Sequence, residues 1–216
     1  MIVLHLERVF GSGTETFIRN QINSIKGFKV VLGCMKCNNP SLLNDNIETI
    51  DCGDTYKISK YYLSRLNYSR LNADIKKLTD LSIIHSHYLV DASYFNRLTK
   101  KINVPKIVSL YGYDISSFPN RFMGFGKYYF MNILKEYDYF LVMSDDMKND
   151  LLKIGCPEEK IIVHYYGTET KRFYYPSREY KAESTINILS LGTVEEKKAQ
   201  NLVLEALSII RNKYNV

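Results

Sequence analysis

The sequence lacks the features that would mark a membrane-spanning or exported protein. No apolar run approaches the ~20 residues that a helix needs to cross a bilayer. The N-terminal segment Met1–Leu6 has neither the basic start nor the apolar stretch of a signal peptide, so we predict a strand there. These two absences favour the cytoplasm as the compartment of the protein.

Cysteine is also scarce, with four residues in a chain of 216, which fits a reducing compartment. Cys34 and Cys37 have C-x-x-C spacing, but no second pair of cysteines or histidines completes a zinc site. The pair leads into a turn at 38–40, whereas a redox pair would sit at a helix N-terminus. We therefore expect no metal or redox role for these cysteines.

Acidic residues are fewer than basic ones, 23 against 29, so the net charge is +6. Nucleic acid, anionic lipid and phosphorylated small molecules are all compatible with such a charge. The length and the 45% content of hydrophobic residues are those of a globular protein of one to two domains with a proper core.

Short apolar runs alternate with amphipathic helical patterns over most of the chain. This alternation predicts an α/β fold, a Rossmann-like doubly wound parallel sheet, over residues 1–175. The expected strands are Ile2–Leu6, Phe28–Gly33, Ile47–Asp51, Leu81–Ile84, Lys106–Leu110, Tyr139–Met143 and Ile161–Val163. The expected helices are Thr14–Ile25, Lys57–Leu78, Ala92–Ile102, Lys127–Tyr137 and Ser144–Ile154, with Ser144 as an N-cap.

The pattern changes after a polar linker at Tyr174–Ser184. Ile186–Leu191 is predicted to be a fresh strand and Lys198–Tyr214 a helix. One strand and one helix cannot form a core alone, so residues 176–216 are expected to be the start of a second, truncated domain.

Polar residues follow two strands that flank one helical pattern in the middle of the chain. His85 and His87 come after the first strand, and Tyr111 and Asp114 after the second. Ligands of open parallel sheets bind beyond the carboxyl ends of the strands, so these side chains are candidate site residues. The two histidines have no third ligand for a metal and are expected to line a polar pocket. His5 and His164 are expected to be core histidines.

A glycine-bearing loop, Gly11-Ser12-Gly13-Thr14, follows the first predicted strand. Such a loop before a helix N-terminus can face an anion, although a plain structural turn has the same composition. Ser12 and Glu15 have the spacing of a capping box. NAD binding is disfavoured, because Thr16 replaces the third glycine and Gly33 is not followed by the acid that would hold a ribose.

Several segments together resemble the retaining GT-B glycosyltransferases of family 4, also called group 1. These segments are "SGTETFIRNQINSI", "IIHSHYLVDASYF", "IVSLYGYDIS", "DYFLVMSDDMKNDLLKIGCPEEKIIVHYYGTETKRF" and "INILSLGTVEEKKAQNLVLEAL". The resemblance implies two Rossmann-like domains, of which the first is the GT-B N-terminal domain. It also implies transfer of a sugar from a nucleotide-sugar to a saccharide or lipid-linked acceptor, with retention, in polysaccharide synthesis. No metal, no cofactor and no nucleic-acid partner are implied.

Site residues follow from the same resemblance. Gly192 and Lys198 match the donor diphosphate site, with Thr193 where an arginine is usual and Ala199 where a glycine is usual. The loop Gly11–Thr14 would face that site across the cleft. Tyr111, where many members have a histidine, and Asp114 would be catalytic. His85 and His87 would bind the acceptor.

The chain departs from the family most clearly in lacking the E-x7-E segment, because it ends at Val216. We therefore expect this polypeptide alone to be inactive, and the alternatives are a non-catalytic binding module or an NAD-dependent sugar-modifying enzyme. Tyr56–Lys77 and Phe118–Tyr129 combine basic and aromatic residues that could contact an anionic membrane. A solvated helix that packs its tyrosines on the sheet is the competing interpretation.

Overall fold

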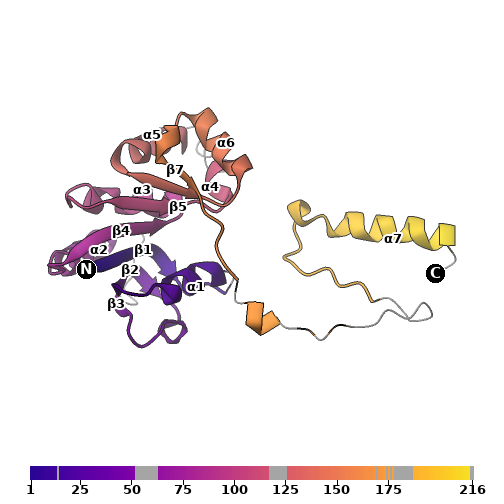
Figure 1. Cartoon of the computed structure of the whole chain (residues 1–216), viewed down its shortest axis with the longest axis horizontal. Coiled ribbons are helices and arrows are strands. Elements are labelled where there is room, and N and C mark those ends of the chain that lie inside the picture. Colours follow the sequence, from indigo (N-terminus) through magenta and orange to yellow (C-terminus); the bar gives the residue numbers. More distant parts are fainter. Residues whose placement is uncertain are drawn as a thin grey trace. The chain divides into compact units, whose positions relative to one another are not determined.

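The computed structural model describes residues 1–13, 15–51, 63–116, 126–168, 170–173, 175, 177 and 187–214. Of 63–68, 116, 126–129, 172, 197, 212 and 214 it describes the backbone alone. The chain forms two compact units, Met1–Glu169 and Thr170–Val216, here called unit 1 and unit 2 (Figure 1). These units are defined by how compactly the chain packs and not as domains. The domain limits inferred from the sequence, 1–175 and 176–216, therefore stay predictions.

Unit 1 is built on a seven-stranded parallel sheet of order β3-β2-β1-β4-β5-β6-β7. The strands are β1 Ile2–Phe10, β2 Lys29–Cys37, β3 Glu48–Asp51, β4 Leu81–His87, β5 Lys106–Ser109, β6 Tyr139–Val142 and β7 Ile161–Val163. The predicted Rossmann-like α/β fold is confirmed, as is the neighbouring parallel arrangement of β1, β4, β5 and β6. The strand order reverses between β1 and β4, and a crevice beyond the carboxyl ends of such strands is the usual ligand site.

Helices cover both faces of this sheet (Figure 1). They are α1 Thr16–Ser24, α2 Leu63–Ile75, α3 Leu89–Thr99, α4 Tyr113–Ser116, α5 Gly126–Glu136 and α6 Asp145–Ile154. Strand β2 explains why two layers of helix are needed. Val30 and Leu32 pack with α1, whereas Val31 packs with α2 and α3. Successive side chains of a strand point to opposite faces, so the buried apolar run of β2, residues 30–35, must be covered on both sides.

Helix α6 has both of its predicted ends. Ser144 is the N-cap, and its hydroxyl accepts a hydrogen bond from the Met147 backbone N–H at 3.2 Å. Gly155 closes the helix in the left-handed region, with φ of 98°.

Helix α1 begins differently from the prediction, because the capping box at Ser12 is wrong. The helix starts at Thr16 with Glu15 as its N-cap, and no side chain caps it. The Ser12 hydroxyl instead donates to the Glu15 carboxylate. That carboxylate is therefore held outside the helix, beside the glycine loop.

Strands β1 and β4 run further than their apolar residues indicated. β1 extends to Phe10 and β4 to His87, so both histidines of β4 lie on the strand and not after it. A central strand is paired on both edges, and the backbone hydrogen bonds continue although the side chains turn polar. The core position expected for His164 is wrong, because this residue follows the edge strand β7 and is exposed.

Unit 2 contains two 3₁₀ turns, Thr170–Phe173 and Glu196–Lys198, and helix α7, Gln200–Tyr214. The predicted strand at 186–191 is wrong over its described residues 187–191, which form no strand. A strand is stable only when another strand pairs with it, and no strand is present among the described residues of this unit. Leu189 and Leu191 are accordingly 84% and 91% exposed.

Candidate functional site

Three histidines lie together where the carboxyl end of β4 runs beside the middle of β1. His5 of β1 is aligned with His85 of β4, and both are buried, as is His87. Figure 1 shows β1 and β4 side by side in the middle of the sheet. The sequence alone leaves His5 separate from this group, because it does not show that β4 lies beside β1 and places His85 opposite His5.

His5, His87 and Tyr111 form one chain of hydrogen bonds. His5 Nδ1 is 2.9 Å from His87 Nε2, and His87 Nδ1 is 2.8 Å from the Tyr111 hydroxyl. The rings of His5 and His87 are inclined by 14°, and their centroids are 5.2 Å apart. That separation exceeds the nitrogen distance by about two ring radii, so the rings lie edge to edge, nearly in one plane. This is the geometry of a strong in-plane hydrogen bond.

The proton positions in this chain depend on one another. If the Tyr111 hydroxyl donates to Gln21, at 3.5 Å, then His87 donates to Tyr111 and His5 donates to His87. The reversed order has Tyr111 donating inward and every proton shifted by one position. In both cases the chain of hydrogen bonds ends at His5 Nε2, which is buried and has no hydrogen-bond partner. The orientation of the Tyr111 hydroxyl is therefore fixed by two buried imidazoles.

The three imidazoles are neutral at pH 7. Burial lowers the pKa of His5 and of His87 well below the ordinary value, and the neighbouring histidines lower both further. Burial lowers the pKa of His85 to about 4, with a smaller effect from His164. The Nε2 of His85 is 2.8 Å from the Ser109 hydroxyl of β5, which holds its ring in place.

The same three histidines could be considered as metal ligands, since one nitrogen of each lies within 4.8 Å of the others. A tetrahedral zinc ion with Zn–N bonds of ~2.0–2.1 Å keeps its nitrogen ligands roughly 3.3 Å apart. The 2.9 Å between His5 Nδ1 and His87 Nε2 is too short for both to bind one ion. As they lie, these histidines fit a hydrogen-bonded chain and not a metal centre.

Three aromatic rings lie close to Tyr111. The ring centroids of Phe17 and Tyr88 lie 4.7 and 4.8 Å from that of Tyr111, and Tyr166 lies at 6.3 Å. Tyr166 is 42% exposed and stacks on Phe17. Burial raises the pKa of Tyr111 well above its ordinary value, so its hydroxyl can hold a hydroxyl group but is a poor base.

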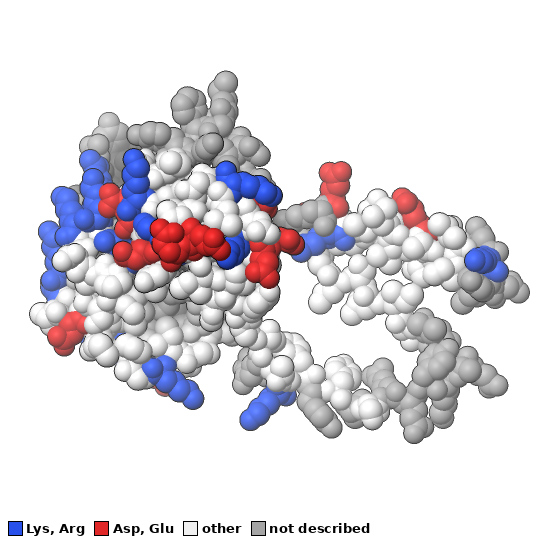
Figure 2. Space-filling view, turned by 45° about the horizontal axis from the view of Figure 1, so that its top comes forward, with Lys and Arg blue, Asp and Glu red and all other residues white. Residues whose placement is uncertain are grey.

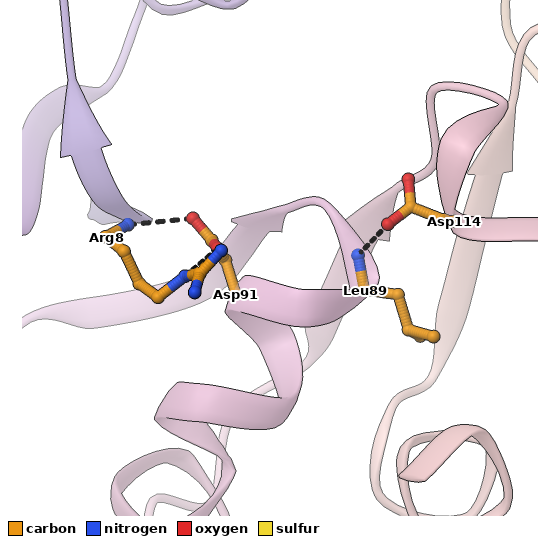
Figure 3. A network of polar contacts seen from close by, with 4 residues as sticks. All are labelled: Arg8, Leu89, Asp91 and Asp114. Carbon is orange, nitrogen blue, oxygen red and sulfur yellow. Dashed lines mark hydrogen bonds and ion pairs between the residues drawn. The ribbon is translucent and has the colours of Figure 1, made fainter. Parts of the chain in front are cut away.

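Asp114 is completely buried, and both of its carboxylate oxygens are engaged. Oδ1 accepts from the Leu89 backbone N–H at 2.8 Å, and Oδ2 accepts from the Tyr111 N–H at 3.1 Å. Figure 3 shows Asp114 directed at the first turn of α3. Burial raises the pKa of Asp114 to about 6, although these two hydrogen bonds act to lower it. The carboxylate ties α3 to the loop that carries Tyr111, which favours a positioning role over contact with substrate.

An ion pair joins β1 to α3. The Arg8 backbone N–H donates to Asp91 Oδ2 at 2.7 Å, and the Arg8 guanidinium pairs with Oδ1 (Figure 3). Burial raises the pKa of Asp91, and the nearby Arg8 charge opposes this. The contact fixes the end of β1, where the glycine loop begins.

The glycine loop lines an open pocket of about 250 Å³. Gly11 has a φ of 83°, and a Cβ there would meet the Asn39 backbone nitrogen at 3.0 Å, so only glycine fits. Gly11, Ser12 and Gly13 all face the pocket, while Thr14 lies outside the described residues. The pocket also contains Glu7, which sequence reasoning missed.

One pattern in the sequence could have identified Glu7. His5 and Glu7 alternate with the core residues Leu4 and Leu6, so a β1 strand extended past Leu6 places both polar residues on one face. The predicted strand ended at Leu6, one residue before Glu7, and therefore missed that alternation.

In unit 2, the predicted donor residues lie close to one another. A Cβ on Gly192 would be 3.8 Å from Lys198 Cγ, and the Gln200 amide donates to the Thr193 carbonyl at 2.8 Å. Ala199 has a φ of 52°, in the left-handed region where glycine is preferred, and it stands where the family pattern has glycine.

The family model of Glycosyltransferase Family 4 matches residues 12–172. Two curated relatives are WcaL of Escherichia coli K12, named as a colanic acid biosynthesis glycosyltransferase, and AmsK of Erwinia amylovora, an amylovoran biosynthesis glycosyltransferase. The chain is 35% identical to WcaL over 78 residues and 25% identical to AmsK over 134 residues. These segments cover 36% and 62% of this chain, but only 19% and 32% of the two relatives.

Solved structures of similar fold include HepE of Anabaena in complex with UDP and glucose, with a TM-score of 0.58 and 15% identity. The match covers 78% of this chain and 45% of HepE. Sucrose-phosphate synthase of Thermosynechococcus elongatus has a TM-score of 0.57 and 16% identity, over 82% of this chain and 50% of that one. At these identities the likeness establishes the GT-B type of fold.

Proposed function

The chain belongs to glycosyltransferase family 4, and we propose that it is the acceptor-side part of an enzyme that transfers a sugar from a nucleotide-sugar. The acceptor is a saccharide or a lipid-linked saccharide, the configuration of the sugar is retained, and the product belongs to a polysaccharide pathway. The names of the two curated relatives support the pathway class, and the UDP bound by HepE supports the donor class.

The observation that carries this proposal is the setting of Tyr111. Its hydroxyl lies near the carboxyl ends of the central strands, held by His87, while Phe17 and Tyr166 present aromatic faces beside it. A fixed polar group among aromatic rings is typical of sites for rings that have one apolar face and several hydroxyls.

The roles follow from this geometry. Tyr111 orients the attacking hydroxyl of the acceptor, and the buried His5–His87 pair fixes the direction in which the Tyr111 hydroxyl points. Asp114 keeps the Tyr111 loop in position. In unit 2, Lys198 and Gly192 contact the diphosphate of the donor, where a lysine ammonium balances charge on the leaving group.

Transfer of a labelled sugar from a panel of nucleotide-sugars to saccharide acceptors, measured with this chain completed by a donor domain, tests the proposal. We expect Tyr111→Phe to lower kcat/KM by about tenfold or more, the worth of one hydrogen bond in the transition state. Tyr113→Phe is the matched control, because Tyr113 is an exposed neighbour. Binding of nucleotide-sugar without any transfer would favour the non-catalytic module, and tight NAD binding would favour the NAD-dependent alternative.

We also propose a contact with anionic membrane. Residues 56–62 and 118–125 of the two stretches that suggested it lie outside the described residues, and of 63–68 and 126–129 only the backbone is described, but Arg70, Lys76 and Lys77 are described and exposed. Leu71 and Ile75 are buried in the core, so the contact would be electrostatic. Figure 2 shows Lys and Arg side chains gathered along one side of unit 1.

Vesicle co-sedimentation tests this contact. Binding should rise with the anionic lipid fraction and weaken as salt is added. Equal binding to neutral and anionic vesicles would refute it. None of the helices in the described ranges is both long and apolar enough to span a bilayer.

A further inference from the structure

Glu7 is a buried acid at the floor of the pocket beside β1. Its side chain is 2% exposed, and its Oε2 atom has no hydrogen-bond partner. Burial raises the pKa of Glu7 to about 9, with smaller contributions from the charges of Glu15 and Asp91. Glu7 is therefore a neutral carboxylic acid at pH 7, which both donates and accepts hydrogen bonds.

The Glu15 side chain lies near Glu7 and interacts with several hydrogen-bond donors. The Ser12 hydroxyl donates to Glu15, and hydrogen bonding with Glu15 contributes to the raised pKa values of both Glu7 and Tyr88. The Glu15 carboxylate is thus held by its neighbours, whereas one oxygen of Glu7 is left for a ligand.

The rest of the pocket is small and mixed in polarity. Phe10 and Leu42 supply apolar wall, Arg19 and Asn39 supply donors, and the volume is about 250 Å³. Sites for drug-sized ligands usually measure ~300–1,000 Å³. The pocket therefore accommodates one small ring and is too small for a whole nucleotide-sugar.

The charges in the pocket disfavour a phosphate. Glu7 and Glu15 both line it, and Arg19 is the one basic residue of the lining. A phosphate group in the pocket would approach the Glu15 carboxylate, and like charges repel each other. This argues against the expected placement of the donor diphosphate on the described part of the loop, Gly11–Gly13.

We propose that this pocket is a subsite for an uncharged, hydroxyl-rich ring, one sugar unit of the acceptor, with Glu7 as its buried hydrogen-bonding residue. The protonated Glu7 carboxyl forms a hydrogen bond with one ring hydroxyl, and the Glu15 carboxylate accepts a hydrogen bond from another. The ring of Phe10 faces the apolar side of the sugar. The identity of the ring as part of an acceptor rests on the proposed glycosyltransferase function.

Amide resonances of the 216-residue chain report binding directly. We expect at least one of methyl α-glucoside, methyl α-galactoside and methyl α-mannoside, at millimolar concentration, to shift the amides of Gly11, Ser12, Gly13 and Glu15. Glu7→Ala should weaken this binding by about tenfold, and Glu7→Gln by no more than about threefold, since the amide keeps a neutral donor and acceptor. Glu48→Gln, on the edge strand β3, is the control and should leave the affinity unchanged.

Sodium pyrophosphate is the competing probe. Displacement of the methyl hexoside by pyrophosphate, or shifts of the same amides by pyrophosphate alone, would overturn the proposal in favour of a diphosphate site. So would the absence of any shift with all three hexosides, or equal losses in Glu7→Gln and Glu7→Ala. If Glu7→Ala does not fold, the hexoside and pyrophosphate titrations of the wild-type chain and of Glu7→Gln still decide.

The sugar-transfer assay, done with this chain completed by a donor domain, separates this inference from the proposed function. Transfer without hexoside shifts in the pocket would remove the subsite and leave the glycosyltransferase. Hexoside binding in the pocket without transfer from any nucleotide-sugar would leave a sugar-binding pocket and remove the enzyme.

Discussion

Replacing Glu7 by glutamine should remove a specific dependence of stability on pH. The pKa of Glu7 is 4.5 in the unfolded reference and about 9 in the folded chain, because the site is buried. Between these values the folded chain holds one proton more than the unfolded chain. The free energy of unfolding therefore falls as pH rises through this window, by about 1.4 kcal/mol per pH unit.

The size of the effect follows from that slope. From pH 5 to pH 8 the wild-type chain should lose on the order of 4 kcal/mol of stability through Glu7 alone. Glutamine has nearly the shape of the protonated acid and cannot ionise. Glu7→Gln should therefore match the wild type near pH 5 and exceed it increasingly toward pH 8.

Urea unfolding followed by far-UV circular dichroism and tyrosine fluorescence measures this difference, since the chain has 18 tyrosines and no tryptophan. Asp114 and the buried histidines also titrate, but they do so in both variants, so the difference between the two curves isolates Glu7. Glu136→Gln, an exposed position on α5, is the control. If the wild type and Glu7→Gln change in parallel from pH 5 to pH 8, Glu7 is ionised in the folded chain and the reasoning is refuted.

Three further predictions concern packing and positioning. Gly33→Ala should cost about 1–3 kcal/mol, because the new Cβ would lie 3.0 Å from Leu6 Cδ2 in a packed layer; urea unfolding checks this. Lys160→Met should cost about 1–3 kcal/mol, because Lys160 Nζ donates to the Leu134 and Tyr137 carbonyls at 2.9 and 2.8 Å, at the end of α5. The same unfolding experiment with the exposed Lys153→Met as control tests it. Asp114→Asn should speed hydrogen exchange of the Leu89 and Tyr111 amides, because an amide group can accept from only one of them; unchanged exchange would show that Asp114 does not hold that loop.

Local signals in the sequence were sufficient for much of the fold. Ser144 and Gly155 marked the ends of α6, and the apolar runs marked all seven strands of the sheet. These features depend on neighbours along the chain. The wrong strand at 186–191 failed for a different reason, since an apolar run becomes a strand only when another strand pairs with it.

The candidate site was only partly predictable for the same physical reason. His85, His87, Tyr111 and Asp114 were found because polar residues follow apolar strands. His5 could not be joined to them without knowing that β1 lies beside β4, a contact between segments about 80 positions apart in sequence. Glu7 could be identified as a site residue only with knowledge of the full length of β1 and of the burial of its carboxyl-terminal part.

The central place of β1 also bears on how the chain is made. Strand β1 is made before both of its neighbours, and β2 can pair with one edge of this strand once residue 37 has emerged. The other edge waits for β4, which is complete only at His87. Until then a newly made chain exposes an unpaired edge lined by Leu4 and Leu6, and such edges are sites of aggregation. The edge of β1 that pairs with β4 thus stays open until His87 has emerged. Nascent chains halted before His87 should therefore need a chaperone more than chains halted after Ser109.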